Sequence, residues 1–404
     1  MSAAGSGVLS GPAGASLTRP IALLSAAAFV SAATMRVADP LVPQVAGEFA
    51  TTAGNAAIMV TAFSLAYGIC QALWGPLGDR FGKFRLVAIM TLASAITVGL
   101  SGLADSLAML AAARLLAGAT AAALIPLAMA FIGDHVAYEQ RQTTIARFLS
   151  GQIMGLLSGQ VFGGAIGDQL GWRAVFAVLA ALYLAVGLLL VLELRRGRLP
   201  PPHLASAGGV TVFVRGVGGM LRRRWPRTVL VVVMLEGALF FGAFAFVGAW
   251  LHDRFGLSFT RIGLLLVGFG LGGLVFALNA RWLVARLGER GLALGGGLLI
   301  AAGFLAIALA PAPLVVTGAL GVLGLGFYMF HNTLQVNATQ MAPDARGLAV
   351  ATFASAFFLG QAGGAWLGGR IVDGVGYPPL FIAAGCGVLA IAVWFVLRRS
   401  TVKA

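Results

Sequence analysis

The sequence predicts an all-α integral membrane protein, with twelve transmembrane helices in two six-helix bundles related by pseudo-two-fold symmetry. Three observations carry this prediction. Hydrophobic residues make up 59% of the 404 residues and charged residues only 10%, whereas a soluble domain carries about 25% charged residues. Apolar runs long enough to cross about 30 Å of hydrocarbon recur along the chain. The second half of the sequence also repeats the pattern of the first.

The apolar runs define twelve expected spans separated by short hydrophilic loops. They cover residues 21–44, 54–77, 84–104, 107–131, 142–167, 172–194, 228–251, 260–284, 291–310, 313–337, 347–371 and 379–397. One long arginine-rich segment divides these spans six and six. The expected organisation is a disordered cytoplasmic tail without a cleaved signal (1–18), an N-terminal bundle (19–194), a cytoplasmic central loop (195–227), a C-terminal bundle (228–398) and a cytoplasmic tail (399–404).

Positive charge sets the expected orientation. The formal net charge is +14, but most of the 27 Lys and Arg residues fall in alternate loops, which is typical of loops on the cytoplasmic side. The intervening loops hold Arg173, Arg254, Arg261 and Arg370. This pattern places both termini in the cytoplasm and explains the charge without a nucleic-acid partner. Because arginine far outnumbers lysine, as in GC-rich bacterial genomes, we expect a bacterial cytoplasmic (inner) membrane.

Polar residues and glycines recur after 205 residues. A gapless shift by this length superposes residues that are not simply apolar. The pairs include Arg141 and Arg346, Ser150 and Ser355, Gly155 and Gly360, Gly159 and Gly364, Asp168 and Asp373, and Gly171 and Gly376. Shared hydrophobicity would not align an arginine, an aspartate and a row of glycines. We therefore expect a parallel internal repeat, which is typical of secondary transporters with a substrate site between the halves.

The loop after the second span carries a recognisable motif. It reads Gly75-Pro-Leu-Gly-Asp79-Arg80-Phe-Gly82-Lys-Phe-Arg85, which resembles the signature loop of the major facilitator superfamily, Gly-x3-Asp-Arg-x-Gly-x-Arg. The motif lies between helices 2 and 3, as it does in that family. We expect Gly75 and Gly82 to permit a tight turn, Asp79 to cap a helix or pair across the bundle interface, and Arg80 and Arg85 to make cytoplasmic contacts. These residues are the expected gate.

Two further motifs resemble that family. Helix 4 reads Leu-x3-Arg114-x3-Gly, and an arginine at this depth is costly unless it is paired or hydrated. Helix 5 carries a row of glycines that resembles the family's antiporter motif, with Gln160 where that motif has proline. The glycines expected to pack helices closely are Gly155, Gly159, Gly163 and Gly164. Small residues four apart allow two helices to approach at backbone distance.

Five ionisable side chains are expected at membrane depth, and they fall in helices 1, 4, 7 and 10. They are Arg36, Asp39, Arg114, Glu236 and His331. The resemblance implies that these four helices line the central cavity, and intramembrane charges mark functional sites. The expected proton-coupling residues are Glu236, Asp39 and His331. The expected substrate contacts are Arg36, Arg114, Asn332, Phe240, Phe244 and Tyr328.

Less specific roles remain open for the same residues. Arg36 and Asp39 are three positions apart and could simply neutralise one another. Glu236 could be a permanently protonated carboxyl bound to a backbone carbonyl, and His331 could be a packing residue. Our hypothesis is that Asp39 pairs with Arg114 and that Arg36 stays free to bind a carboxylate or phosphate of the substrate. In the reverse assignment, Arg114 contacts the substrate.

The function predicted from these features is secondary active transport. We expect proton-coupled efflux of small amphipathic molecules by alternating access, as the resemblance to drug–proton antiporters implies. The alternatives are a proton-coupled uptake symporter or a uniporter, and, in another class, a membrane sensor or scaffold with a transporter fold. The sequence holds no phosphate loop and no His-Glu-x-x-His or Gly-x-Ser-x-Gly motif, so we expect no enzymatic activity, cofactor or metal. The expected energy source is the proton gradient, and the expected oligomeric state is a monomer.

Overall fold

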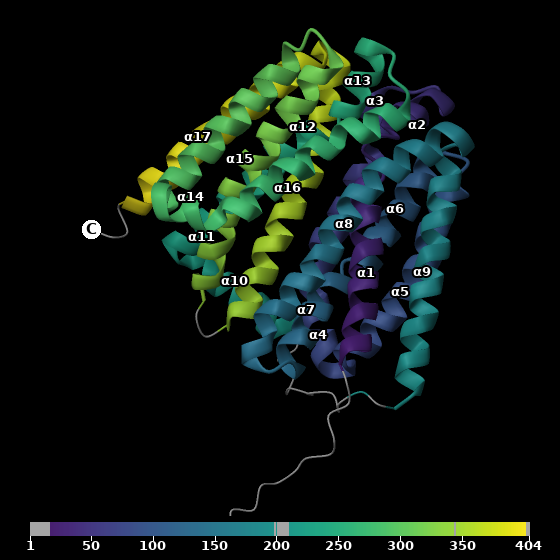
Figure 1. Cartoon of the computed structure of the whole chain (residues 1–404), viewed down its shortest axis with the longest axis vertical. Coiled ribbons are helices and arrows are strands. Elements are labelled where there is room, and N and C mark those ends of the chain that lie inside the picture. Colours follow the sequence, from purple (N-terminus) through teal and green to yellow (C-terminus); the bar gives the residue numbers. More distant parts are fainter. Residues whose placement is uncertain (1–16, 198, 200–209, 343–344, 401–404) are drawn as a thin grey trace, which may run out of the picture.

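The computed structural model describes residues 17–197, 199, 210–342 and 345–400, and these form helices joined by short connections. The predicted tails lie almost wholly outside the described residues. The N-terminal bundle contains α1 (Thr18–Arg36), α2 (Val42–Glu48), α3 (Ala53–Ala56), α4 (Ile58–Phe81), α5 (Lys83–Gly102), α6 (Leu107–Ala121), α7 (Leu124–His135), α8 (Tyr138–Leu170) and α9 (Trp172–Arg195). Figure 1 shows these helices side by side.

The C-terminal bundle follows a connecting helix, α10 (Val210–Arg222). Its first span is α11 (Arg224–Glu236), a π-helical segment (Gly237–Phe241), α12 (Gly242–Phe244) and α13 (Val247–Phe255). The rest consists of α14 (Phe259–Ala308), α15 (Pro313–Gln340), α16 (Arg346–Val375) and α17 (Tyr377–Ser400). Part of the predicted central loop is therefore helical.

The described helices account for the twelve predicted spans. Ten segments are long and apolar enough to cross a membrane. One of them, α14, is two helices that meet at Gly288, where φ is 59°. The remaining span is α8, a more polar helix of 33 residues. The all-α membrane fold is thus confirmed among the residues that the structure describes.

The predicted internal repeat is visible in the turns. Gly171 precedes α9 with φ 83°, and Gly376, its partner in the repeat, precedes α17 with φ 87°. Gly82, in the signature loop, has φ 89° and ends α4. Such angles favour glycine because it has no Cβ. Gly75 was expected in the same tight turn, but this prediction is wrong, since Gly75 lies inside α4 with open space around it.

The first span is shorter than predicted. Its helix ends at Arg36 rather than near residue 44, and the chain passes through a turn before α2 begins at Val42. Pro40 lies in this turn and has no N–H to donate to a helix. The interruption sets Asp39 in a turn rather than in a helix, and it leaves backbone carbonyls that side chains can bind.

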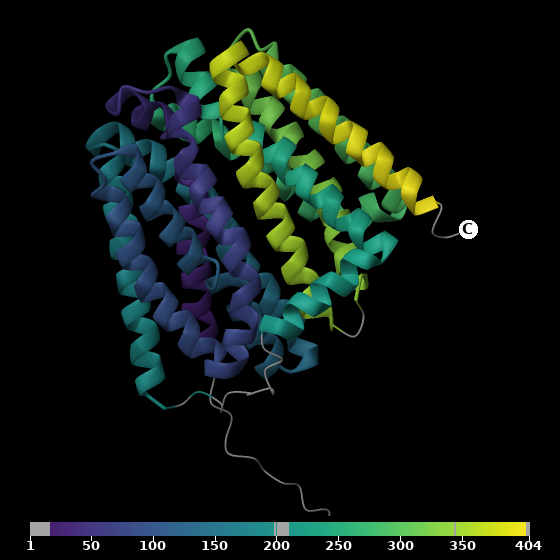
Figure 2. The same cartoon turned by 180° about the vertical axis from the view of Figure 1, so that it is seen from behind.

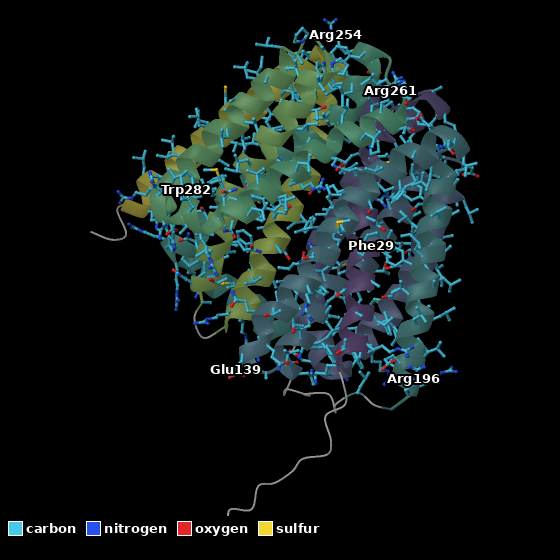
Figure 3. The ribbon with its side chains drawn as sticks, viewed as in Figure 1. Phe29, Glu139, Arg196, Arg254, Arg261 and Trp282 are labelled. Atoms are coloured by element: carbon cyan, nitrogen blue, oxygen red, sulfur yellow. The ribbon has the colours of Figure 1, made fainter. Side chains whose placement is uncertain are left out.

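The two bundles converge at one end and diverge towards the other in both views (Figures 1 and 2). Figure 3 labels Glu139 and Arg196 at one end of the N-terminal bundle, and Arg254 and Arg261 at the far end of the molecule, where the bundles converge. We call the end with Arg196, which also carries the Gly82 turn and the start of α11, the basic end. The end where the bundles meet is the closed end.

Candidate functional site

The closed end is held by two equivalent aspartates. Asp168, at the end of α8, accepts hydrogen bonds from the backbone N–H groups of Phe259 (2.9 Å) and Thr260 (2.6 Å) at the start of α14. Asp373, at the end of α16, accepts from the Thr52 hydroxyl (2.7 Å) and the Gly54 N–H (3.1 Å) at the start of α3. Each carboxylate therefore binds the N-terminus of a helix in the other bundle, where a negative charge is stabilised.

Glycines bring helices together around this contact. A methyl group on Gly155, Gly159 or Gly163 would overlap the backbone of α1 near Phe29, Ala33 and Val37, respectively. Gly164 lies instead against the carbonyl of Phe259, in the other bundle. Three of the glycines expected to pack helices thus lie within the N-terminal bundle, and the fourth lies at the interface between the bundles.

Arg36 and Asp39 form an ion pair at the end of α1. Their nitrogen–oxygen distance is 3.8 Å, which is too long for a close hydrogen bond. Gln160 on α8 donates to the same Asp39 oxygen at 3.5 Å, and the other oxygen is buried with no partner among the described residues. The Arg36 guanidinium stacks on the ring of Phe241 at 3.8 Å, a favourable cation–π geometry. The side chain of Arg36 is buried except for 11% of its surface.

Arg114 on α6 is fully buried and is bound differently. It donates to the carbonyl of Met59 on α4 (3.1 Å) and to that of Thr34 on α1 (3.4 Å). Its guanidinium also lies over the rings of Phe63 (4.3 Å) and Phe176 (5.4 Å). Arg114 thus joins α1, α4 and α9 next to the interruption of the first span.

These contacts correct the predicted pairing. Asp39 forms its ion pair with Arg36, its neighbour in the chain, and not with Arg114. The hypothesis of an Asp39–Arg114 pair is therefore wrong in this conformation, because Arg114 is bound instead by the carbonyls of Thr34, near the end of α1, and of Met59 on α4. The alternative in which Arg36 and Asp39 neutralise one another describes the observed geometry.

Glu236 and His331 meet in the C-terminal bundle. Glu236, the last residue of α11, lies 2.8 Å from the Nδ1 atom of His331 on α15. The Glu236 carboxyl is completely buried, its second oxygen has no partner, and the His331 side chain is 19% exposed. The π-helical segment begins directly after Glu236, and such segments are frequent at functional sites. The expectation of a Glu236 carboxyl bound to a backbone carbonyl is not what the structure shows.

Aromatic rings surround this pair. His331 stacks on Phe327 at 4.9 Å and contacts Phe357 on α16 at the same distance. Phe240 and Phe244, expected to contact substrate, are fully buried in the same cluster of rings. Tyr328 and Asn332, also on α15, are half-buried. The rings keep water from the carboxyl while one edge of the imidazole stays accessible.

The signature loop folds back on its own bundle. Lys83 binds Asp79 at 2.7 Å and Asp134, at the end of α7, at 2.6 Å. The guanidinium of Arg80 lies over the ring of Phe81 at 5.3 Å, and Arg85 is exposed. Asp79 was expected to cap a helix or pair across the bundle interface, but in this conformation its ion pair is with Lys83.

Sequence reasoning missed several partners. Gln160 was considered only as a departure from a motif, yet it binds Asp39. Gln361 on α16 donates to the hydroxyl of Ser64 on α4 at 2.9 Å, between the bundles. Amide side chains in otherwise small and apolar helices are the signal that could have found both. The role of Phe357 had no such signal, because the chain contains 26 phenylalanines.

Comparisons with known proteins agree with this architecture. The chain is 27% identical over 366 residues to YfhI of Bacillus subtilis (strain 168), an uncharacterized MFS-type transporter, covering 86% of this chain and 87% of that protein. It is 28% identical over 209 residues to the multidrug export protein EmrB of Escherichia coli (strain K12), covering 51% of this chain and 41% of EmrB.

Two solved structures share the fold. A mutant of the nucleoside transporter NupG superposes with a TM-score of 0.78 at 14% identity, over 93% of this chain and 99% of that one. A D-xylose-proton symporter superposes with a TM-score of 0.72 at 18% identity, over 94% of this chain and 97% of that one. The model of the Major Facilitator Superfamily matches residues 24–345 and 247–404. The chain therefore belongs to the Major Facilitator Superfamily of membrane transporters.

Proposed function

We propose that this transporter exports small amphipathic molecules in exchange for protons. The observation that carries the proposal is the Glu236–His331 pair, a carboxyl and an imidazole in contact inside a membrane-spanning bundle. Histidine changes its charge near neutral pH, and a buried carboxyl must be paired or protonated. One proton therefore converts this pair between two charge states, which is what a coupling site requires.

The orientation follows from charge. The basic end holds most of the loop arginines, which supports a position on the cytoplasmic side of a bacterial inner membrane. The conformation described is then closed on the outside by Asp168 and Asp373. In alternating access, a solute enters from the cytoplasm, the closed end opens, and a proton taken up from outside resets the pair.

Arg36 is the proposed substrate contact. Its guanidinium lies on the ring of Phe241 and forms only a long ion pair with Asp39. An anionic or strongly electronegative group on the substrate would displace Asp39 as the partner of Arg36 and accept hydrogen bonds from two of its donors. The aromatic rings of the C-terminal bundle would contact the apolar part of an amphipathic molecule.

Export is favoured over uptake by the similarity to EmrB, which is named a multidrug export protein. The second candidate, a proton-coupled uptake symporter, is supported by the structural similarity to a D-xylose-proton symporter and by Gln160 at the proline position of the antiporter motif. The two candidates differ in the direction of proton movement relative to the solute. In exchange, solute and proton move in opposite directions, whereas in symport they move together.

Reconstitution into liposomes tests the proposal. A pH-sensitive dye inside the vesicles reports proton movement when a panel of amphipathic solutes is added outside. Each transported solute should drive protons in the opposite direction, and an imposed pH gradient should concentrate that solute. Movement in the same direction would identify a symporter, and solute transport without proton movement would identify a uniporter. Absence of any transport would contradict the proposal.

A further inference from the structure

A pocket of about 670 Å³ lies at the basic end of the C-terminal bundle, between α11 and α17. It is lined mainly by three arginines, two tryptophans and a threonine. These are Arg224, Arg227, Arg398, Trp225, Trp394 and Thr228. No acidic residue is among the lining residues. Its walls are the ends of two membrane-spanning segments, Arg224–Phe255 and Tyr377–Arg399.

The helical spacing of these residues builds the pocket. Arg227 and Thr228 follow Arg224, near the start of α11, by three and four positions, so both lie on the same side of the helix as Arg224. Trp394 and Arg398 share a face of α17 for the same reason. Trp225 packs its ring on Phe395 at 5.5 Å, which fixes the indole at the wall.

Among the residues that the structure describes, Arg224 and Arg227 of the pocket have no acidic partner. The acid near the end of α17 is Glu289, and it forms an ion pair with Arg399 rather than with a pocket residue. Arg224 and Arg227 are exposed. The adjacent α10 and its junction with α11 add three more exposed arginines, Arg215, Arg222 and Arg223. The pocket thus lies within a wider basic surface.

This combination selects one class of ligand. Arginine binds phosphate oxygens in a bidentate manner, and indole rings prefer the boundary between hydrocarbon and headgroups. A soluble anion would use the arginines but would gain nothing from two tryptophans at a membrane boundary. We propose that the pocket binds the headgroup phosphate of an anionic phospholipid, whose acyl chains continue along the apolar surfaces of α11 and α17. Basic pockets between transmembrane helices are known to bind such headgroups.

The site also lies on the helix that bears Glu236. The α11 helix starts at Arg224, in the pocket, and ends at Glu236, about 18 Å further along its axis. A bound headgroup would hold the start of α11 against α17. The binding of lipid at this pocket does not depend on the proposed transport function.

Native mass spectrometry of the full chain tests the site directly. Phosphatidylglycerol and phosphatidylcholine with identical acyl chains are titrated onto delipidated protein in detergent. We expect phosphatidylglycerol to bind more tightly than phosphatidylcholine. R224Q/R227Q should weaken the binding of phosphatidylglycerol about 25-fold, because each basic residue contributes roughly fivefold to the affinity. R224K/R227K keeps the charges and should retain most of the affinity.

The matched control removes the same charge elsewhere at the basic end. Arg147 and Arg195 are exposed residues of the N-terminal bundle, and R147Q/R195Q should bind phosphatidylglycerol like the wild type. An equal loss in this control would overturn the proposal by showing non-specific attraction. Two results with the wild-type protein would also overturn the proposal, and they can be obtained even if the double variant fails to fold. They are equal binding of phosphatidylcholine, and displacement of phosphatidylglycerol by excess inorganic phosphate, which would identify a site for a free anion.

Discussion

The two bundles hold their buried charges in different ways. In the N-terminal bundle, Arg36 is paired with Asp39, and Arg114 is bound by two backbone carbonyls and two aromatic rings. In the C-terminal bundle, the carboxyl of Glu236 has one partner, the imidazole of His331. On the proposed function, the first set supplies a guanidinium for the substrate, whereas the second changes its charge with a single proton. The proposed function therefore divides the roles, with structure and substrate contact in one half and proton chemistry in the other.

The internal repeat sharpens this contrast. At the closed end the halves match, since Asp168 and Asp373 occupy equivalent positions and bind equivalent helix N-termini. At membrane depth they do not match. A shift of 205 residues places Arg36 on Phe241, the ring on which its guanidinium stacks. The halves therefore share the aspartates that hold the closed end, and they differ in the side chains at membrane depth.

The largest effect is expected from removing Arg114. Arg114→Ala removes the hydrogen bonds to the carbonyls of Met59 and Thr34 and opens a cavity beneath Phe63, so the free energy of unfolding should fall by on the order of 3 kcal/mol. Thermal unfolding of the purified protein, followed by tryptophan fluorescence, measures the change. Arg36→Ala, at the more accessible arginine, should lower the unfolding temperature much less. Equal losses would contradict the structural role of Arg114. Because Asp39 is not paired with Arg114, Asp39→Asn should not rescue Arg114→Ala.

A loss of substrate binding is expected next, at Arg36. Arg36→Lys keeps the charge but removes the planar guanidinium from the ring of Phe241 and loses bidentate binding. Affinity for a transported solute should fall about tenfold, with expression and unfolding temperature unchanged. Equilibrium binding to the reconstituted protein measures the effect. If Arg36→Lys binds normally and Arg114→Lys loses the solute, the two arginines have the opposite roles.

The matching aspartates of the closed end should give equal, intermediate effects. Asp168→Asn or Asp373→Asn weakens the charged contact with a helix N-terminus, at a cost of about 1–2 kcal/mol to the closed state. Double electron–electron resonance measures the distances between spin labels on the two bundles at this end. These distances should shift towards an open population in each variant and further in the double variant. Spin labels require prior replacement of Cys70 and Cys386, the free cysteines.

The control for these variants is Asp253→Asn at the same end. Asp253 accepts a hydrogen bond from Tyr377 within the C-terminal bundle, so its loss should leave the distances between the bundles unchanged. If Asp168→Asn and Asp373→Asn behave like this control, the aspartates do not hold the closed end.

The smallest effect is expected at Asp79 in the signature loop. Asp79→Asn removes one of two partners of Lys83, which keeps Asp134. If Asp79 stabilises the state that is closed at the basic end, its loss should favour the conformation described here, in which the bundles diverge at that end. The spin-label distances across the basic end should then increase slightly. A distribution identical to the wild type would remove Asp79 from the gate.

Most of the fold could be predicted because it follows from patterns along the chain. Span number, the division into halves and the repeat depend on hydrophobic length and on glycines with positive φ, such as Gly171 and Gly376. The end of the first span could not be placed, because Pro40 and Pro43 allow several points of interruption. Nor did the arginine-rich composition of 195–227 reveal that part of it forms α10.

The candidate site was only partly predictable. Five intramembrane charges could be assigned to four helices, but their partners depend on how those helices rotate and pack. Arg114 binds the carbonyl of Thr34 near the early end of α1, a position that the sequence did not reveal. Glu236 and His331 are 95 residues apart, and no pattern in the chain indicates that they touch.

The central claim is that Glu236 carries the coupling proton, and one substitution tests it most directly. Glu236→Gln keeps the shape of the side chain but removes its exchangeable proton. In liposomes, we expect this variant to lose solute accumulation driven by a pH gradient while retaining exchange of labelled for unlabelled solute. Glu193→Gln is the matched control, because Glu193 is also buried but pairs with Arg19 and Arg196 outside the cavity, and it should stay coupled. Solute accumulation by Glu236→Gln equal to that of the wild type would contradict the account.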